Sequence, residues 1–176
     1  KEKIKEKLRF DKCSKILLVV GGGLGAKNIN SAVIAGSPEL LKDPEVVIVH
    51  ITGHKLYNDV ITEYEKQNVD ENRVVCLPFT SSLYLYSGVA DVVISRAGAT
   101  NMAELSVQAK ACIVVPNPLL AGGHQLKNAE VFEKSNSAII VQENDLTKSL
   151  LRATIDLLND KEKQKELDKI EQNQYR

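Results

Sequence analysis

The chain has 176 residues, with 43% apolar and 26% charged side chains, a balance typical of one globular domain rather than of a disordered segment. Its 23 basic and 23 acidic residues give a net charge of zero, so it has no long-range field to attract nucleic acid or an anionic membrane. An anionic ligand would therefore be bound locally, by backbone amides or a few side chains.

Short apolar runs alternate with amphipathic stretches along the whole chain. The runs predict strands at residues 15–20, 46–50, 73–76, 92–95, 112–115 and 138–141. The stretches between them predict helices near residues 26–34, 55–67, 82–87, 101–109, 124–133 and 146–158. Continuous apolar strands are typical of a sheet covered on both faces, and strict alternation with helices indicates βαβ units. We therefore expect an α/β fold with a doubly wound, parallel, six-stranded Rossmann-like sheet in residues 15–160.

The two ends of the chain differ from its middle. Residues 1–14 are expected to be a linker or a marginal helix, because only Ile4 and Leu8 share a helical face there. Residues 161–176 are mostly charged and polar, with Leu167 and Ile170 as their aliphatic side chains, and predict a solvated helical tail. The first residue is Lys1 rather than Met, from which we expect a fragment of a longer protein.

A glycine-rich segment follows the first predicted strand. Residues 21–26 read Gly-Gly-Gly-Leu-Gly-Ala, and a helix is expected directly after them. Glycines allow a sharp turn and a close approach of the backbone, while the helix start offers free N–H groups and a partial positive charge. In an open parallel sheet, ligands bind at the carboxyl ends of the strands, where this segment lies. We interpret it as a phosphate-binding loop; a tight turn without ligand is the alternative.

The same segment also fits a dinucleotide-binding fingerprint, Gly21-x-Gly23-x-x-Ala26, so a nicotinamide-binding domain is a rival hypothesis. That fingerprint expects an acidic residue at the end of the second strand to bind the ribose. The nearest acids, Asp43 and Glu45, precede that strand instead. The mismatch counts against a nicotinamide cofactor. A non-catalytic nucleotide-binding module is a third hypothesis.

Two further loops carry candidate nucleotide contacts. Phe79 and Thr80 follow the third strand, where the ring could lie beside a flat base; packing of Phe79 in the core is the alternative. Gly98 lies in the loop after the fourth strand, and the next helix bears Glu104 off its apolar stripe. A carboxylate there could accept hydrogen bonds from both ribose hydroxyls, or could simply favour the positive end of the helix.

A fourth loop, at residues 116–123, leads into a helix that begins with His124 and Gln125. A neutral amide and an imidazole suit a sugar, whose hydroxyls need both donors and acceptors. His124 could equally be a polar residue at a helix start without any catalytic role.

Together these loops resemble a known series: a glycine-rich loop, Phe-Thr, Ser-Arg-Ala-Gly-Ala with Glu104, and Val-Pro before His-Gln-x-x-Asn-Ala. The chain resembles the C-terminal, UDP-N-acetylglucosamine-binding half of MurG-like glycosyltransferases, over about residues 15–145. These are GT-B enzymes with two Rossmann-like halves, and MurG itself converts lipid I to lipid II in peptidoglycan synthesis. The resemblance implies an inverting N-acetylglucosaminyltransferase.

The resemblance also implies a role for individual residues. Gly22, Gly23, Leu24 and Gly25 would bind the diphosphate, and the Thr80 backbone beside Phe79 would meet uracil, with Gly98 nearby. Glu104 would bind the ribose, His124 and Gln125 the donor sugar, and Asn128 would support their helix. The family often has Ser at the position of Gly23, so backbone amides alone would bind phosphate there.

The resemblance implies a missing half as well. In the family, an N-terminal half or separate subunit supplies the acceptor site, the membrane contact and the base, so we expect no catalytic residue here and no transfer by this chain alone. The full enzyme would be cytoplasmic and peripheral to the inner face of the cell membrane. We expect no metal and no cofactor. Cys13, Cys76 and Cys112 fit no metal-ligand spacing and are expected to be reduced thiols, which suits that compartment.

Overall fold

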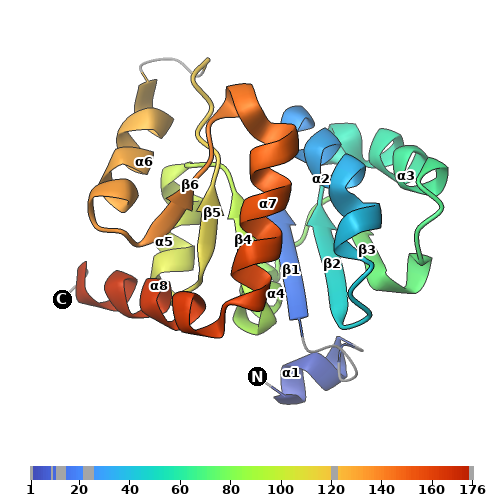
Figure 1. Cartoon of the computed structure of the whole chain (residues 1–176), viewed down its shortest axis with the longest axis horizontal. Helices are drawn as coiled ribbons and strands as arrows, with labels where there is room; N and C mark the ends of the chain where they lie inside the picture. The colour runs from blue at the N-terminus through green and yellow to red at the C-terminus, as the bar shows by residue number, and fades with distance from the viewer. Residues whose placement is uncertain (1, 9, 11–14, 22–25, 120–122, 175–176) are drawn as a thin grey trace.

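The structure is a computed structural model that describes residues 2–8, 10, 15–21, 26–119 and 123–174. One parallel six-stranded sheet runs through it in the order β3-β2-β1-β4-β5-β6 (Figure 1). The strands are β1 (Lys15–Val20), β2 (Val46–Ile51), β3 (Val74–Leu77), β4 (Val92–Ser95), β5 (Cys112–Val114) and β6 (Ala138–Ile140). The predicted doubly wound α/β fold is therefore confirmed, and the strand ends differ by one residue or so from those predicted.

Helices cover both faces of the sheet (Figure 1). The α-helices are α1 (Glu2–Lys7), α2 (Lys27–Leu40), α3 (Tyr57–Lys66), α4 (Leu83–Val89), α5 (Ala99–Val107), α6 (His124–Lys134), α7 (Leu146–Asn159) and α8 (Lys161–Gln174). Side chains of α2 and α7 pack on one face, and those of α4, α5 and α6 pack on the other. Short 3₁₀ helices include η1 (His54–Leu56), η2 (Glu71–Arg73) and η4 (Glu143–Asp145).

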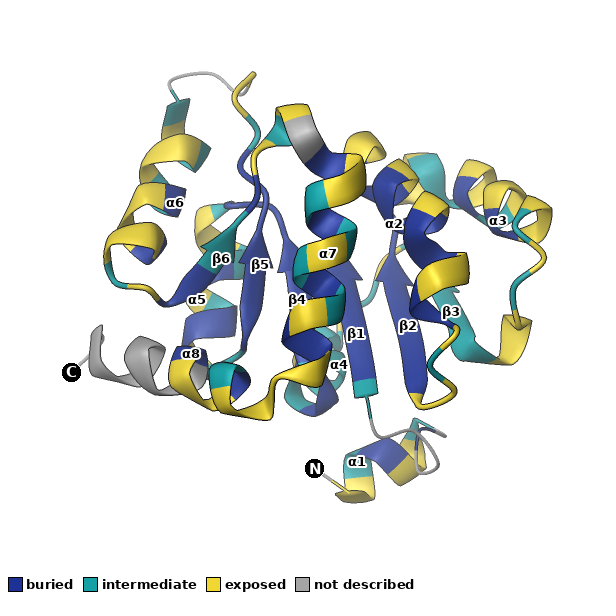
Figure 2. Ribbon diagram, viewed as in Figure 1, coloured by how far each residue is buried: buried dark blue, intermediate teal, exposed yellow. Residues whose placement is uncertain are grey.

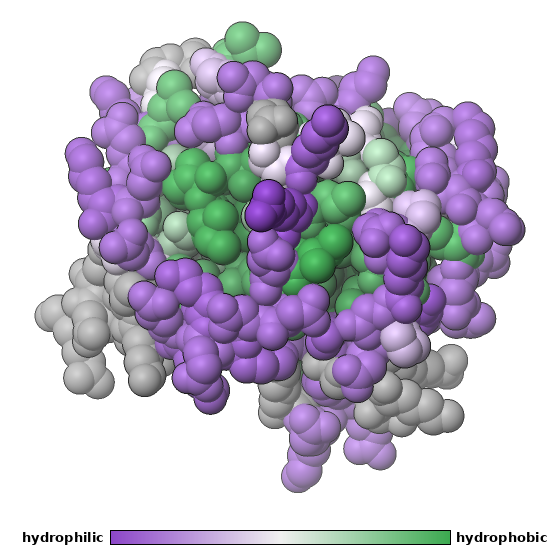
Figure 3. Space-filling view, viewed as in Figure 1, coloured by the Kyte–Doolittle hydropathy of each residue, from purple (hydrophilic) through white to green (hydrophobic). Residues whose placement is uncertain are grey.

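Successive residues of each central strand point to opposite faces, which divides the core into two clusters. In β1, Leu17 and Val19 join the cluster under α2 and α7, whereas Ile16 and Leu18 join the one under α4 to α6. The central strands β1 and β2 are buried except at Lys15, the first residue of β1, while the edge strand β3 is only half-buried (Figure 2). On the face that bears α2 and α7, apolar patches remain visible between hydrophilic side chains (Figure 3).

The strand order reverses at β1, whose neighbours are β2 and β4. The helix after β1 crosses to one face and the helix after β4 to the other, so the connecting loops diverge. Ligands of open α/β sheets bind in the crevice at such a switch point, outside the carboxyl ends of the strands. The fold thus places Gly21, directly after β1, and the Ser95–Gly98 loop side by side at the carboxyl edge of the sheet.

Helix α2 extends further than its sequence predicts. The sequence predicted a helix near residues 26–34, and both Gly36 and Pro38 beyond it disfavour a helix interior. It continues to Leu40 instead, with Pro38 inside it. The proline cannot donate to the Ile34 carbonyl four residues earlier, but the buried Ser37 hydroxyl donates to that oxygen at 2.7 Å. A side chain therefore satisfies the acceptor that the proline leaves open.

Both ends of the chain pack on the domain. Ile4 and Leu8 of the N-terminal segment contact the cluster under α4 to α6. The start of α8 was expected to be solvated, yet Leu167 is 1% exposed and joins the core cluster beside α7. Gln164, also buried, donates a hydrogen bond to the Leu157 carbonyl at 2.7 Å.

Candidate nucleotide site

The start of α2 lies at the carboxyl end of β1. The Gly21 amide donates to the Ile51 carbonyl at 3.3 Å, and the Ala26 carbonyl accepts the Asn30 amide at 2.8 Å, which closes the first helical turn. That turn bears no acidic side chain. Its leading N–H groups and the positive end of the helix dipole are therefore suited to an anion. All four predicted diphosphate contacts, Gly22, Gly23, Leu24 and Gly25, lie outside the described residues.

Phe79 forms an exposed aromatic wall after β3. Its side chain is 57% exposed, so the alternative that it belongs to the core is wrong. It stacks on His54 with ring centroids 5.5 Å apart and planes at 22°. His54 follows Gly53, whose φ of 86° turns the chain after β2. His54 could not be selected from the sequence, because its contact with Phe79 depends on the pairing of β2 with β3.

A small cavity of about 80 Å³ adjoins this wall. Its lining residues come from β1, β2, the β3–α4 loop and two helices: Val20, Ile51, Pro78, Phe79, Thr80, Leu83 and Asn101. The Thr80 hydroxyl accepts the Ser82 amide at 3.0 Å, which shapes the start of α4. The structure thus brings Phe79 and Thr80 together with the start of α5, at the carboxyl ends of β1 and β2.

Helix α5 packs through Met102 and Leu105, as the apolar spacing predicts, and Glu104 is half-buried beside them. Glu104 lies one turn after Asn101, which lines the small cavity, so the two share a helix face. Gly98 precedes α5, and open space surrounds the position of a Cβ there. The helix ends before Ala109, which has a φ of 50°, although the sequence predicted Ala109 to continue it.

The first turn of α6 is fixed to its surroundings by two amide side chains. Asn128 donates to the Ala97 carbonyl at 2.9 Å, which connects α6 to the loop after β4. The oxygen of Gln125 accepts the Asn117 amide at 2.9 Å, so part of this side chain is already engaged with the protein. His124 is exposed at the helix start.

An ion pair that sequence reasoning missed lies at the same edge. Arg96 is 8% exposed and pairs with Glu143, which also accepts a hydrogen bond from Nδ2 of the Asn28 side chain at 2.6 Å. Arg96 donates in addition to the Val115 carbonyl at 3.3 Å. The hydrogen bonding of Arg96 to Glu143 is the main reason why the pKa of Glu143 is lowered. The cluster connects the starts of α2 and α7 to the end of β4.

Other candidate features carry less chemistry. Cys76 and Cys112 are free thiols, and burial raises the pKa of Cys76 to about 11; Cys13 lies outside the described residues. Within the described part of the chain, no group of three or more His, Cys, Asp or Glu side chains could hold a metal ion. No described helix is both long and apolar enough to cross a bilayer.

Comparison with known proteins decides the family. The model of the glycosyltransferase family 28 C-terminal domain matches residues 16–175. The chain belongs to this family. Its resemblance to MurG-like enzymes is thereby confirmed, and nothing in the matches supports a nicotinamide-dependent oxidoreductase.

Three relatives illustrate the similarity. An N-acetylglucosamine transferase of Halothermothrix orenii that acts on a pyrophosphoryl-undecaprenol is 33% identical over 164 residues, covering 91% of this chain and 44% of its own length. Its namesake from Geotalea daltonii is 36% identical over 140 residues, covering 79% of this chain and 37% of its own. The crystal structure of Acinetobacter baumannii MurG superposes with a TM-score of 0.75 at 26% identity, covering 98% of this chain and 49% of that one. The chain thus spans under half the length of these relatives.

Proposed function

We propose that this chain binds UDP-N-acetylglucosamine as the donor half of an inverting, MurG-like glycosyltransferase. The observation that carries the proposal is the arrangement at the carboxyl edge of the sheet in this family 28 domain. The exposed Phe79 ring adjoins a small cavity beside the end of β1. There the glycine segment leads into α2, whose first turn bears no acidic side chain. An aromatic wall suits a base, and a helix start suits a diphosphate.

The proposed contacts follow the order of the ligand. The diphosphate would lie on the amides of Gly22, Gly23, Leu24 and Gly25 and on the start of α2. Uracil would lie by Phe79 with the Thr80 backbone at its edge, near Gly98, and Glu104 would accept the ribose hydroxyls. His124 and the part of Gln125 not engaged with Asn117 would contact the sugar, while Asn128 supports the α6 start.

In the reaction, the oxygen of an acceptor hydroxyl would attack the anomeric carbon as the bond from that carbon to the diphosphate oxygen breaks. The electron pair leaves with UDP, and the hydroxyl proton passes to a base outside this chain. The protein's contribution here is electrostatic: amides and the α2 dipole stabilise the negative charge that develops on the leaving diphosphate.

The acceptor site and the base belong, in this proposal, to an N-terminal half, on the same chain or on a separate subunit. The relatives' names describe a polyprenyl-linked acceptor. We propose the same class of acceptor, lipid I converted to lipid II, and an enzyme that is peripheral to the cytoplasmic face of the membrane through that other half.

A titration followed by amide NMR tests the proposal. UDP and UDP-N-acetylglucosamine should shift the amides of residues 21–26 and of Thr80, whereas NAD should leave them unmoved. UDP-glucose serves as the control for the N-acetyl group. Tight NAD binding without a response to UDP would contradict the proposal.

A further inference from the structure

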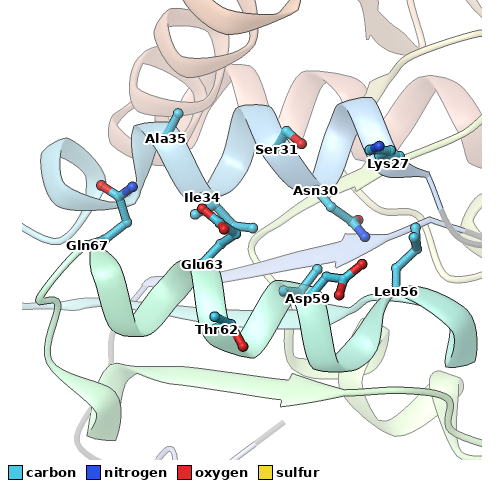
Figure 4. Close-up of a pocket in the computed structure, with 11 residues that line it drawn as sticks. Lys27, Asn30, Ser31, Ile34, Ala35, Leu56, Asp59, Thr62, Glu63 and Gln67 are labelled. Atoms are coloured by element: carbon cyan, nitrogen blue, oxygen red, sulfur yellow. The ribbon is translucent and has the colours of Figure 1, made fainter.

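Buried polar side chains form one continuous line of hydrogen bonds beneath the groove between α2 and α3. His50, in β2, is fully buried; its Nδ1 lies 2.9 Å from the Tyr64 hydroxyl and its Nε2 lies 3.0 Å from Asn30 Oδ1. Asn30 Nδ2 in turn donates to the Thr52 carbonyl at 3.1 Å. Asn30 leaves α2 on the side that faces α3 and lines the groove, of about 480 Å³ (Figure 4).

The donor and acceptor of each hydrogen bond in this line follow from the Thr52 carbonyl, at which the line ends. The Thr52 carbonyl can only accept, so the NH₂ group of Asn30 faces it and the amide oxygen faces His50. That oxygen also can only accept, so His50 carries its proton on Nε2. Nδ1 is then an acceptor, and the Tyr64 hydroxyl donates to it. A single tautomer and a single amide orientation satisfy all three bonds.

Burial keeps the line in this state at neutral pH. Desolvation lowers the pKa of His50 to about 3, so the ring stays uncharged. A fully satisfied, buried polar network of this kind specifies one arrangement of the elements it joins. It therefore acts as a fixed brace rather than as a proton-driven switch.

The line joins the two parts of the candidate nucleotide site. Within the line, Asn30 lies between His50 and Thr52, and its backbone amide closes the first turn of α2, directly after the glycine segment. At the end of the line that Asn30 contacts, Thr52 precedes Gly53 and His54, and His54 stacks on Phe79. We propose that Asn30 and His50 are positioning residues that set the spacing between the diphosphate-binding start of α2 and the base-binding wall at Phe79. This inference rests on the proposed function.

A pair of matched variants tests it. Asn30→Ala and Gln164→Ala each remove a buried amide that donates to a backbone carbonyl, at 3.1 Å and 2.7 Å respectively. Gln164 lies in α8, near the amino ends of the strands and away from the site (Figure 1). Both variants should unfold at lower urea concentration than the wild type. Only Asn30→Ala should weaken UDP binding, by about tenfold in calorimetry, the loss expected when two subsites can no longer be occupied together without reordering.

His50→Phe is a second variant that keeps the ring volume while removing the donor to Asn30. It should still fold, but at lower stability, because Asn30 Oδ1 and the Tyr64 hydroxyl stay buried without their partner on His50, and it should also weaken UDP binding. In nucleotide-free NMR spectra, the His54 ring signals should move in Asn30→Ala and His50→Phe but not in Gln164→Ala. This inference alone is overturned if Asn30→Ala and His50→Phe both keep the wild-type UDP affinity, or if Gln164→Ala loses as much UDP affinity as they do. A wild-type chain that binds no UDP would instead contradict the proposed function.

Discussion

At the scale of single residues, Glu104 gives the sharpest test of ligand contact, because it shares a face of α5 with the cavity-lining Asn101. Hydrogen bonds to a charged group contribute about 1.5–3 kcal/mol, so Glu104→Ala should weaken UDP binding by about 10- to 100-fold in calorimetry. Its urea midpoint should stay close to that of the wild type, since Ala suits a helix.

Glu133→Ala is the matched control for this prediction. Glu133 is an exposed acid at the opposite end of α6 from His124 and Gln125, and its removal should leave UDP affinity unchanged. If Glu104→Ala retains wild-type affinity but loses stability, the carboxylate serves only as a favourable charge near the helix start.

His50 should also make the fold sensitive to acid. Its pKa is about 3 in the folded chain and about 6.5 when unfolded, so between these values the unfolded state binds a proton that the folded state does not. The free energy of unfolding therefore falls as pH drops through this window. His50→Phe lacks this contribution, so it should lose less stability than the wild type between pH 7.5 and pH 4 in urea melts. Parallel losses in the two proteins would show that carboxylates alone account for the acid sensitivity.

At the scale of elements, the strands could be predicted because β1, β2 and β4 are continuous apolar runs that the sheet buries on both faces. The extent of α2 could not, since it depends on the Ser37 hydroxyl satisfying the carbonyl that Pro38 leaves open. Local propensity contains no information about such compensation.

Some residues of the candidate site could be predicted from the sequence and others could not. Phe79, Thr80 and Glu104 could be selected because they follow strand ends in order along the chain. His54 and the Arg96–Glu143 pair could not, because each contact joins residues that only the tertiary fold brings together. His50 offers one usable signal: a polar side chain within an apolar strand requires a buried partner.

Helix α8 supplies a prediction at this scale. Leu167 is 1% exposed in the core cluster beside α7, so Leu167→Ala should lower the free energy of unfolding by about 2–5 kcal/mol. Val107→Ala, at a side chain that is 81% exposed, should change it by less than about 0.5 kcal/mol. UDP affinity should be unchanged in both. Equal and small effects would mean that α8 is the solvated tail its composition suggests.

At the scale of the whole molecule, this chain should bind the donor without transferring sugar. Transfer requires both reactants in a near-attack geometry, an effect worth about 7–11 kcal/mol of barrier, and the proposed acceptor site and base lie in another half. Radiolabelled UDP-N-acetylglucosamine and lipid I should give labelled lipid only when a matching N-terminal half is added. Rapid product formation by the chain alone would refute this division of labour.

A crystal structure of the chain with UDP-N-acetylglucosamine tests the central claim most directly. We expect the diphosphate on the amides that precede α2, uracil beside Phe79 and the ribose hydroxyls on Glu104. A nucleotide bound elsewhere, for example in the groove between α2 and α3, with the carboxyl edge of β1 empty, would contradict the account.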